Sequence, residues 1–430
     1  MVEVEDAAAI EMALLGEAGA VSGAVPADQK TGGAVLTDGE REIPVQRTED
    51  GRYLFCAPEV PPKGYKTFAV KCTGNLARGT MEVSASRMEN RFFIIEYNDK
   101  GQFSRIYDKR ERRELLRPGT AGNVIMSYED RPHNYDAWDI NNYYTEKSWE
   151  IDQVRSIEVT EDGPVRAAVT VVRDYLDSRI TQTVYIYEDV PRIDIRNVVD
   201  WKEHLILLKD LFPLDIHTDE ATFEIQFGNV KRSTHSNTSW DFAKFEVCAH
   251  KWIDLSEYGY GVSLLNDSKY GCSVKDGVVG LTMLKSPVYP NPEADKEIHE
   301  FWYSIYPHRG EWKQGETVKQ AYQLNNPMRA VVKRTKGGTL PASDSLISVD
   351  ADNVVIETVK MAEDGDGMVV RLYECHNRRS EAVLTTGRTI RQAVETDMLE
   401  EKPKELAVEG NRIGIRLLPY EIKTVKIRLE

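Results

Sequence analysis

The sequence lacks the features that mark membrane-spanning, secreted and nucleotide-binding proteins. No apolar run approaches the roughly 20 residues of a membrane-spanning helix. The acidic start MVEVED has no basic region of the kind that opens a signal peptide. The motifs GxGxxG, GxxxxGKS/T and GxSxG are also absent, so neither nucleotide binding nor serine-hydrolase chemistry is indicated. We therefore expect no membrane partner.

Cysteine and positive charge are both scarce. The five cysteines are scattered and never in CxxC spacing: Cys56, Cys72, Cys248, Cys272 and Cys375. This usage favours reduced thiols in a cytoplasmic compartment over a disulfide framework. The 55 Lys and Arg residues against 70 Asp and Glu give a formal net charge of −15, which would repel a phosphate backbone. We expect no nucleic-acid partner, whereas a neutral ligand such as a sugar is compatible with this charge.

Long segments of helical period are absent as well, and strand patterns take their place. Only residues 7–15 (AAAIEMALL) show helix propensity, and there we expect a short helix or a loop. Elsewhere apolar and polar residues alternate in short runs separated by Gly, Pro, Asn and Asp. Ile193, Ile195 and Asn197, for example, fall on one face of such a run. The pattern predicts an all-β protein built of antiparallel sandwiches.

The chain is too long for one ordinary core, and changes in composition divide its 430 residues. We predict a small β domain over residues 1–86 and a large antiparallel β-sandwich over 87–330. Residues 331–345, rich in Lys, Gly, Pro and Ser, are predicted to be a linker. The strand lengths and spacing of residues 346–430 suit an immunoglobulin-like sandwich.

Four segments of the central block are rich in groups that bind polyols, and we predict them to be loops. They are residues 128–139, 230–237, the part of 245–271 around His250, and 287–308. Carboxylates accept hydrogen bonds from sugar hydroxyls, and Trp or Tyr rings stack on the apolar face of a pyranose. The alternative is that these loops only cap the ends of a large sandwich, with aromatics in satellite cores and carboxylates holding turns.

Catalytic and metal-binding patterns are weak by comparison. A glycosidase needs two carboxylates at a fixed separation, but with 70 acidic residues a pair by itself carries no information. Neither His217 with Asp219 nor His250 with Asp254 forms a recognised ligand set, and a zinc site needs three or four converging ligands. We therefore predict no catalytic residue, no metal ligand and no cofactor in this chain.

A family resemblance runs through the same segments and continues towards both ends. It is carried by Phe245–Gly271, Gly122-Asn123, Tyr128–Pro132, Tyr135–Asp139, Leu284–Pro287, Pro292, Asp295, His299, Tyr303 and Pro307-His308, and then by Val60–Tyr65, Lys360–Gly365, Arg371–Glu374 and Pro419–Thr424. Taken in the order of the chain, these segments resemble the C-terminal half of glycoside hydrolase family 38 α-mannosidases, most closely the bacterial and cytosolic type. The resemblance implies a galactose-mutarotase-like super-sandwich for the large central part.

What the resemblance implies about function concerns a longer protein. Family members hydrolyse terminal α-D-mannosides by a zinc-dependent retaining mechanism in a catalytic domain that carries a Gly-His-x-His-x-Asp motif and precedes a helical bundle. Neither the motif nor the bundle is found in this sequence. We therefore expect a C-terminal fragment that is inactive alone. Its expected partners are its own absent catalytic domain, which holds the zinc, and a mannose-containing oligosaccharide.

The resemblance also implies roles for individual residues. In the family the large sandwich packs on the catalytic domain, and some of its loops approach the substrate-binding rim. Our rim candidates are Tyr128, Asp130, Asp136, Trp138 and Asp139. The other signature residues are expected to be structural: His250, Trp252, Asp254, Asp295, His299 and His308. Two alternatives remain: a stand-alone carbohydrate-binding module, and an aldose-mutarotase-like enzyme that would need a His and a Glu converging in one groove.

Overall fold

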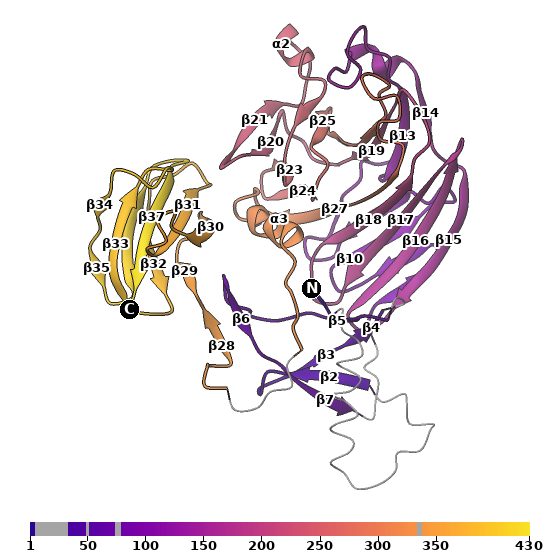
Figure 1. Cartoon of the computed structure of the whole chain (residues 1–430). Helices are drawn as coiled ribbons and strands as arrows, with labels where there is room; N and C mark the ends of the chain where they lie inside the picture. The colour runs from indigo at the N-terminus through magenta and orange to yellow at the C-terminus, as the bar shows by residue number, and fades with distance from the viewer. Residues whose placement is uncertain (5–32, 49–50, 74–78, 333–337) are drawn as a thin grey trace.

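The computed structural model describes residues 1–4, 33–48, 51–73, 79–332 and 338–430. The segment 7–15, for which we expected a helix or a loop, lies outside these residues. The described chain consists almost entirely of antiparallel strands, so the predicted all-β fold is confirmed. None of its described helices has the length and apolar character needed to cross a membrane. Figure 1 shows a large β-sandwich with a separate C-terminal sandwich at its side and small N-terminal sheets below.

A nine-stranded sheet forms one layer of the large sandwich. On β17 alternate residues such as Ile180 and Val184 are fully buried, which is the period-2 pattern of a strand packed on a core. In spatial order the strands are β15 (Val154–Asp162), β16 (Arg166–Tyr175), β17 (Ser178–Tyr187), β18 (Ile193–Asp200), β27 (Ile298–Arg309), β24 (Tyr260–Asn266), β23 (Trp252–Glu257), β20 (Glu220–Ile225) and β21 (Gly228–Ser233).

Two smaller sheets form the opposite layer, and a bridge between Phe103 and Gly122 joins them. The six-stranded sheet runs β14 (Ser148–Glu150), β13 (Val124–Glu129), β19 (Ile206–Pro213), β26 (Val278–Lys285), β25 (Gly271–Lys275) and β22 (Val247–Cys248). The five-stranded sheet runs β12 (Arg113–Glu114), β11 (Phe103–Asp108), β10 (Phe93–Tyr97), β9 (Arg87–Glu89) and β8 (Glu82–Ser84). One continuous apolar core takes buried side chains from all three sheets, among them Phe93, Phe212 and Val184. Burying each such side chain contributes about 1.5–3 kcal/mol.

All four segments predicted to be loops contain strand residues, although in the first these are only Tyr128 and Glu129 at the end of β13. Residues 252–257 form β23, residues 298–309 form β27, and β21 takes in the start of the 230–237 segment. The loop prediction was wrong for β23 because both of its faces are covered. Ile253 and Leu255 face the main core, whereas Trp252 packs with Trp312 and with Ala321 of helix α3 (Thr317–Asn325). A strand buried on both faces loses the polar–apolar alternation by which strands are recognised.

The N-terminal part forms small sheets below the large sandwich. Their strands are β1 (Val2–Val4), β5 (Tyr53–Phe55) and β4 (Gln46–Arg47) in one sheet, and β3 (Glu42–Pro44), β2 (Gly33–Thr37) and β7 (Ala69–Thr73) in another. A third pairs β6 (Gly64–Lys66) with β28 (Ser343–Ser345), which lies in the segment predicted to be a linker. Through this pairing the chain that leads into the C-terminal sandwich is tied to the N-terminal part.

The C-terminal sandwich packs a four-stranded sheet on a five-stranded one. The first runs β29 (Ile347–Val349), β32 (Ser380–Thr386), β36 (Arg412–Leu417) and β35 (Val408–Glu409), and the second β30 (Val354–Met361), β31 (Met368–Glu374), β37 (Ile422–Leu429), β33 (Ile390–Thr396) and β34 (Lys404–Glu405). Its own core includes Leu372, Leu384 and Val425. It contacts the large sandwich through polar and aromatic pairs, such as the bond from Asn229 Nδ2 to the Cys375 carbonyl oxygen at 3.2 Å.

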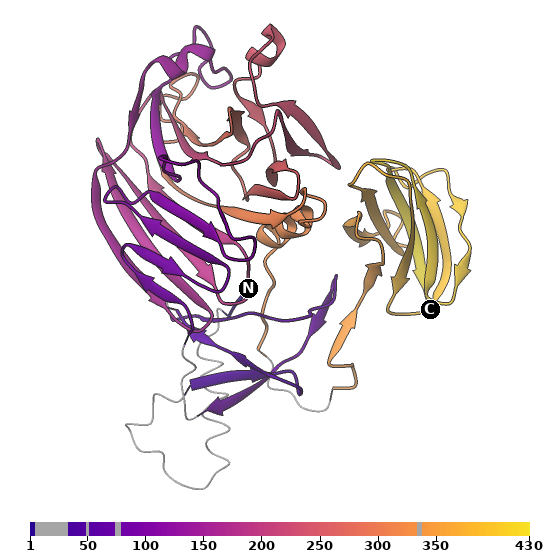
Figure 2. The ribbon, with the colours of Figure 1, turned by 180° about the vertical axis from the view of Figure 1, so that it is seen from behind.

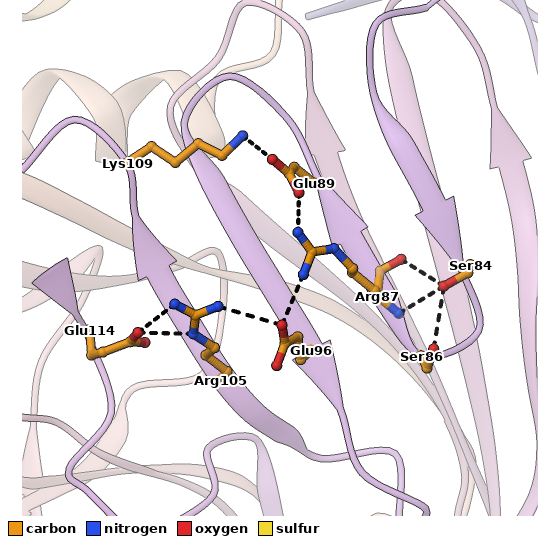
Figure 3. Close-up of polar contacts among 8 residues, drawn as sticks. All are labelled: Ser84, Ser86, Arg87, Glu89, Glu96, Arg105, Lys109 and Glu114. Atoms are coloured by element: carbon orange, nitrogen blue, oxygen red, sulfur yellow. Dashed lines mark hydrogen bonds and ion pairs between the residues drawn. The ribbon is translucent and has the colours of Figure 1, made fainter. Parts of the chain in front are cut away.

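The outer face of the five-stranded sheet carries a row of alternating charges, shown in Figure 3. The row consists of Lys109, Glu89, Arg87, Glu96, Arg105 and Glu114. Within it Arg87 donates to Glu96 at 2.9 Å, and Arg105 donates to Glu114 at 2.7 Å. Solvent-exposed pairs of this kind contribute about 0–1 kcal/mol each. Their clearer effect is to make this face largely polar, with the partly exposed Ile94 and Tyr107 between the charged pairs.

Candidate functional site

Two loops of the large sandwich meet at one edge of the six-stranded sheet. The first follows β13 and runs through residues 130–141 to the short 3₁₀ helix η2 (Asn142–Glu146), and the second, residues 286–297, follows β26. Strands β13 and β26 flank β19, and both run antiparallel to it. They therefore run in the same direction and leave the sheet at the same edge. This topology brings together loops that lie about 150 residues apart in the sequence.

Lys285 ties the two loops together. Its ammonium group pairs with the Asp130 carboxylate, which is only 2% exposed, and donates to the backbone carbonyl oxygen of Asp139 at 2.8 Å. Burial raises the pKa of the Asp130 carboxyl above its ordinary value, and the Lys285 charge counteracts that rise. Asp130 and Asp139, both rim candidates, are thus held by a lysine that the list of candidates omitted.

Asp136 makes a second tie between the loops. Its carboxylate accepts hydrogen bonds from the backbone N–H groups of Val288 at 2.7 Å and Tyr289 at 3.1 Å. Because the side chain is buried, water cannot readily replace these bonds. The rim candidate Asp136 therefore fixes the shape of the site and does not present its carboxylate to a ligand.

An aromatic pocket lies beside these ties, and we define it by Tyr135, Trp138, Asp139 and Tyr289. The three rings are 65%, 69% and 58% exposed for Tyr135, Trp138 and Tyr289, respectively. Their centroids lie 6.1–6.5 Å apart, and both contacts of Trp138 are edge-on. Together with Asp139 they line an open cavity of about 500 Å³. Three solvent-facing rings beside an exposed carboxylate are suited to a ligand that has an apolar face and hydroxyl groups.

The structure places the rim candidate Tyr128 elsewhere. Its ring is buried on β13 against Tyr144 of η2, with centroids 5.1 Å apart, and Leu207 completes the cluster. Burial raises the pKa of the Tyr128 hydroxyl. Conversely, Tyr289 lines the pocket although it was not among the candidates. A Tyr-Pro pair in a loop gives no local signal for proximity to Trp138, because the pairing of β13, β19 and β26 creates that proximity.

Asp254, Ser263 and His308 form a buried polar cluster that has the composition of a hydrolase triad. His308 Nε2 lies 2.8 Å from Asp254 Oδ2 and 3.2 Å from Ser263 Oγ, and Ser263 Oγ also donates to Asp254 at 2.8 Å. The carboxylate and the hydroxyl thus meet the same ring nitrogen, whereas a triad uses opposite nitrogens. All three side chains are at most 3% exposed, so no substrate reaches them. The cluster joins β23, β24 and β27 under α3.

The remaining signature residues lie near neighbouring strand ends. Trp252 is 1% exposed and packs on Trp312 with ring centroids 5.0 Å apart. His250 Nε2 lies 3.2 Å from Gln226 Nε2, and its imidazole meets the Tyr270 ring edge-on. His299 Nε2 bonds to the backbone carbonyl oxygen of Asp295 at 2.8 Å. Packing and hydrogen bonds thus hold all three side chains, although His250 Nδ1 is buried without a hydrogen-bond partner among the described residues.

The described residues do not fit a zinc site. Within them, no group of three or more His, Cys, Asp or Glu side chains converges as metal ligands would. The zinc that the family resemblance implies therefore has no place in the described parts of this chain, and no chemical step is assigned to it here.

Known proteins similar to the chain are α-mannosidases. Alpha-mannosidase 2C1 of Homo sapiens is 33% identical over 351 residues, which cover 80% of this chain and 34% of that protein. Alpha-mannosidase G of Dictyostelium discoideum is 34% identical over 349 residues, 79% of this chain and 32% of that protein. The chain thus spans about a third of the length of the curated relatives it matches. A crystal structure of an α-mannosidase from Enterococcus faecalis V583 shares the fold, with a TM-score of 0.74 and 15% identity over the whole of this chain and 53% of that one.

Two family models match in the order of the chain. Residues 88–293 match the glycosyl hydrolases family 38 C-terminal domain, and residues 353–425 match the family 38 C-terminal beta sandwich domain. These ranges fall within the large sandwich and the C-terminal sandwich, respectively. The chain belongs to glycoside hydrolase family 38 and corresponds to the C-terminal region of its α-mannosidases.

Proposed function

We propose that this chain is the non-catalytic C-terminal region of an α-mannosidase whose full-length form hydrolyses terminal α-D-mannosides by a zinc-dependent retaining mechanism. The observation that carries the proposal is the likeness to α-mannosidases over about four-fifths of this chain and only a third of theirs. In this proposal the zinc and the nucleophile belong to a catalytic domain outside the chain. The scattered thiols, with no disulfide among the described cysteines, favour a cytoplasmic location.

The large sandwich has two roles in this proposal: it supports the catalytic domain and shapes the rim of its substrate site. The 130–141 loop and the short helix α2 (Ser239–Phe242) project at the same end of the large sandwich (Figures 1 and 2). Trp240 and Phe242 of α2 are 80% and 52% exposed, as expected of side chains that a further domain covers. That end is therefore the proposed contact with the catalytic domain.

A chromogenic α-mannoside tests the proposal. The chain alone, with zinc added, is expected to show no hydrolysis. A longer polypeptide of the same protein that includes the catalytic domain is expected to be active and to lose activity with a chelator. Measurable turnover by the chain alone would overturn the proposal.

A stand-alone carbohydrate-binding module is the second candidate, and the aromatic pocket is the observation that favours it. The two candidates differ in what the native protein must contain. An accessory region requires a catalytic domain in the same protein, whereas a module requires none. An aldose-mutarotase-like enzyme is less favoured. His308 pairs with an aspartate in a closed cluster, and Glu224, which lies 3.9 Å from His250, is buried and does not face a groove. Mutarotation of α-D-mannose monitored by polarimetry in the presence of the chain separates that third candidate from the others.

A further inference from the structure

We propose that the aromatic pocket is a sugar subsite whose lining is complete within this chain and that holds one pyranose ring of an oligosaccharide. The identity of the sugar, a mannose unit of an oligosaccharide, rests on the proposed function. The pocket itself rests on the geometry of Tyr135, Trp138, Asp139 and Tyr289.

The pocket is formed before any ligand arrives. Asp136 holds the backbone of Val288 and Tyr289, and Lys285 holds Asp130 and the carbonyl oxygen of Asp139. Two side chains thus fasten each loop to the other beside the pocket. Because the loops are already ordered, ligand binding there loses little conformational entropy, and a small contact area can give measurable affinity.

The lining favours a pyranose over other ligands. The rings contact one another obliquely, so that their faces are not stacked together and more than half of each residue is exposed. A pyranose offers a patch of C–H groups for such a face and hydroxyl groups for the Asp139 carboxylate. No Lys or Arg lines the cavity, so an anionic ligand would meet only a negative group. A cavity of about 500 Å³ lies within the range of small-ligand sites and has room for a sugar ring.

The lining of the pocket cannot by itself cleave a glycosidic bond. Hydrolysis with retention needs two carboxyl groups about 5–5.5 Å apart across the scissile bond. Asp139 is the single carboxylate in the lining, and the neighbouring Asp130 and Asp136 are buried and bonded to Lys285 and to backbone N–H groups. The chain alone is therefore expected to bind a ring in this pocket without cleaving it.

Calorimetric titration of the chain with an α-linked mannobiose tests the subsite. We expect saturable heat at millimolar sugar, and Trp138→Ala should weaken binding by at least about tenfold. Trp138→Phe keeps an aromatic face and should stay within about threefold of the native affinity. The matched control is Trp240→Ala, which removes another exposed indole, on α2 and outside the pocket, and should leave binding unchanged. Thermal melting of each variant checks that it is folded.

Three results would overturn the subsite: no saturable heat, equal binding by Trp138→Ala and Trp240→Ala, or equal binding of sorbitol. Sorbitol has hydroxyl groups but no ring face, so its binding would exclude stacking. Failure of the proposed function has a different signature, since it consists of α-mannoside hydrolysis by the chain alone, whatever the state of Trp138.

Discussion

The Asp136 carboxylate accepts the backbone N–H of Tyr289 across 153 positions of sequence, at 3.1 Å, and it does so from a buried position. The bond lies beside the aromatic pocket, to which Tyr289 contributes its ring. It positions the loop that carries Tyr289 against the loop that carries Trp138, with the two ring centroids 6.4 Å apart. The carboxylate is thus used for positioning, which leaves the exposed Asp139 as the acidic group available to a ligand.

Asp136→Ala should destabilise the chain. The variant leaves the N–H groups of Val288 and Tyr289 without their acceptor, and a loss of about 1–3 kcal/mol in the free energy of unfolding is expected. The stability of Asp136→Asn should lie between that of the native chain and that of Asp136→Ala, because an amide has one acceptor oxygen in place of two. The control is Asp139→Ala in the same loop, which should change stability by at most about 0.5 kcal/mol. Urea denaturation measures all three, and equal losses for Asp136→Ala and Asp139→Ala would contradict the assignment.

Lys285→Met should lower stability in a pH-dependent way. The substitution leaves the buried Asp130 carboxylate unpaired, and removal of one partner of a buried pair costs about 3–5 kcal/mol. It also raises the pKa of Asp130 further above its unfolded value. An acid whose folded pKa is raised loses stability as pH rises above the unfolded pKa of about 3.9, so the deficit should be small near pH 4 and full at neutral pH.

The double variant Asp130→Asn with Lys285→Met tests whether the unpaired Asp130 carboxylate causes the pH-dependent loss of stability. It removes the charge that Lys285 neutralises, so the steep pH dependence of the single variant should disappear. Thermal unfolding at a series of pH values measures both proteins. A deficit in Lys285→Met that does not change between pH 4 and 8 would mean that lost packing, and not the unpaired carboxylate, explains the effect.

Asp210 should make the large sandwich less stable as pH rises. Its carboxyl group is buried in the core beside the Tyr303 hydroxyl, and burial raises its pKa to about 7. Because the folded chain holds this proton more tightly than the unfolded chain, the free energy of unfolding should fall from about pH 4 to pH 7, by up to about 4 kcal/mol from this group. Asp210→Asn should flatten the profile. The exposed Asp162→Asn on β15 is the control and should leave it unchanged.

His250→Ala should act on stability and leave sugar binding intact. The imidazole contacts Gln226 and the edge of Tyr270, and loss of these contacts should lower the free energy of unfolding by about 1–2 kcal/mol. His217→Ala, at an exposed position, should change it by less than about 0.5 kcal/mol. An unchanged melting temperature together with lost mannobiose binding would show that His250 has a ligand-binding role instead.

The sequence by itself determined the all-β class and the family. Alternation is a local, period-2 pattern, so it is visible wherever one face of a strand is buried and the other is wet, as on β17. It failed on β23 and β27, where both faces are covered and polar side chains such as Asp254 and His308 bond to one another inside the protein. Those side chains indicated loops only because their partners are distant in sequence.

Only the tertiary structure decided which rim candidates line the aromatic pocket. Trp138 and Asp139 line the pocket, whereas Asp130 and Asp136 form the bonds that hold its loops together. Tyr128 is buried in the small cluster with Tyr144 and Leu207. The reason is that loop proximity depends on non-local strand pairing. Strands β13 and β26 end at one edge because β19 lies between them, and no pattern within either loop encodes that arrangement. The sequence therefore indicated the residue types of the pocket, but it did not indicate that the loops after β13 and β26 lie side by side.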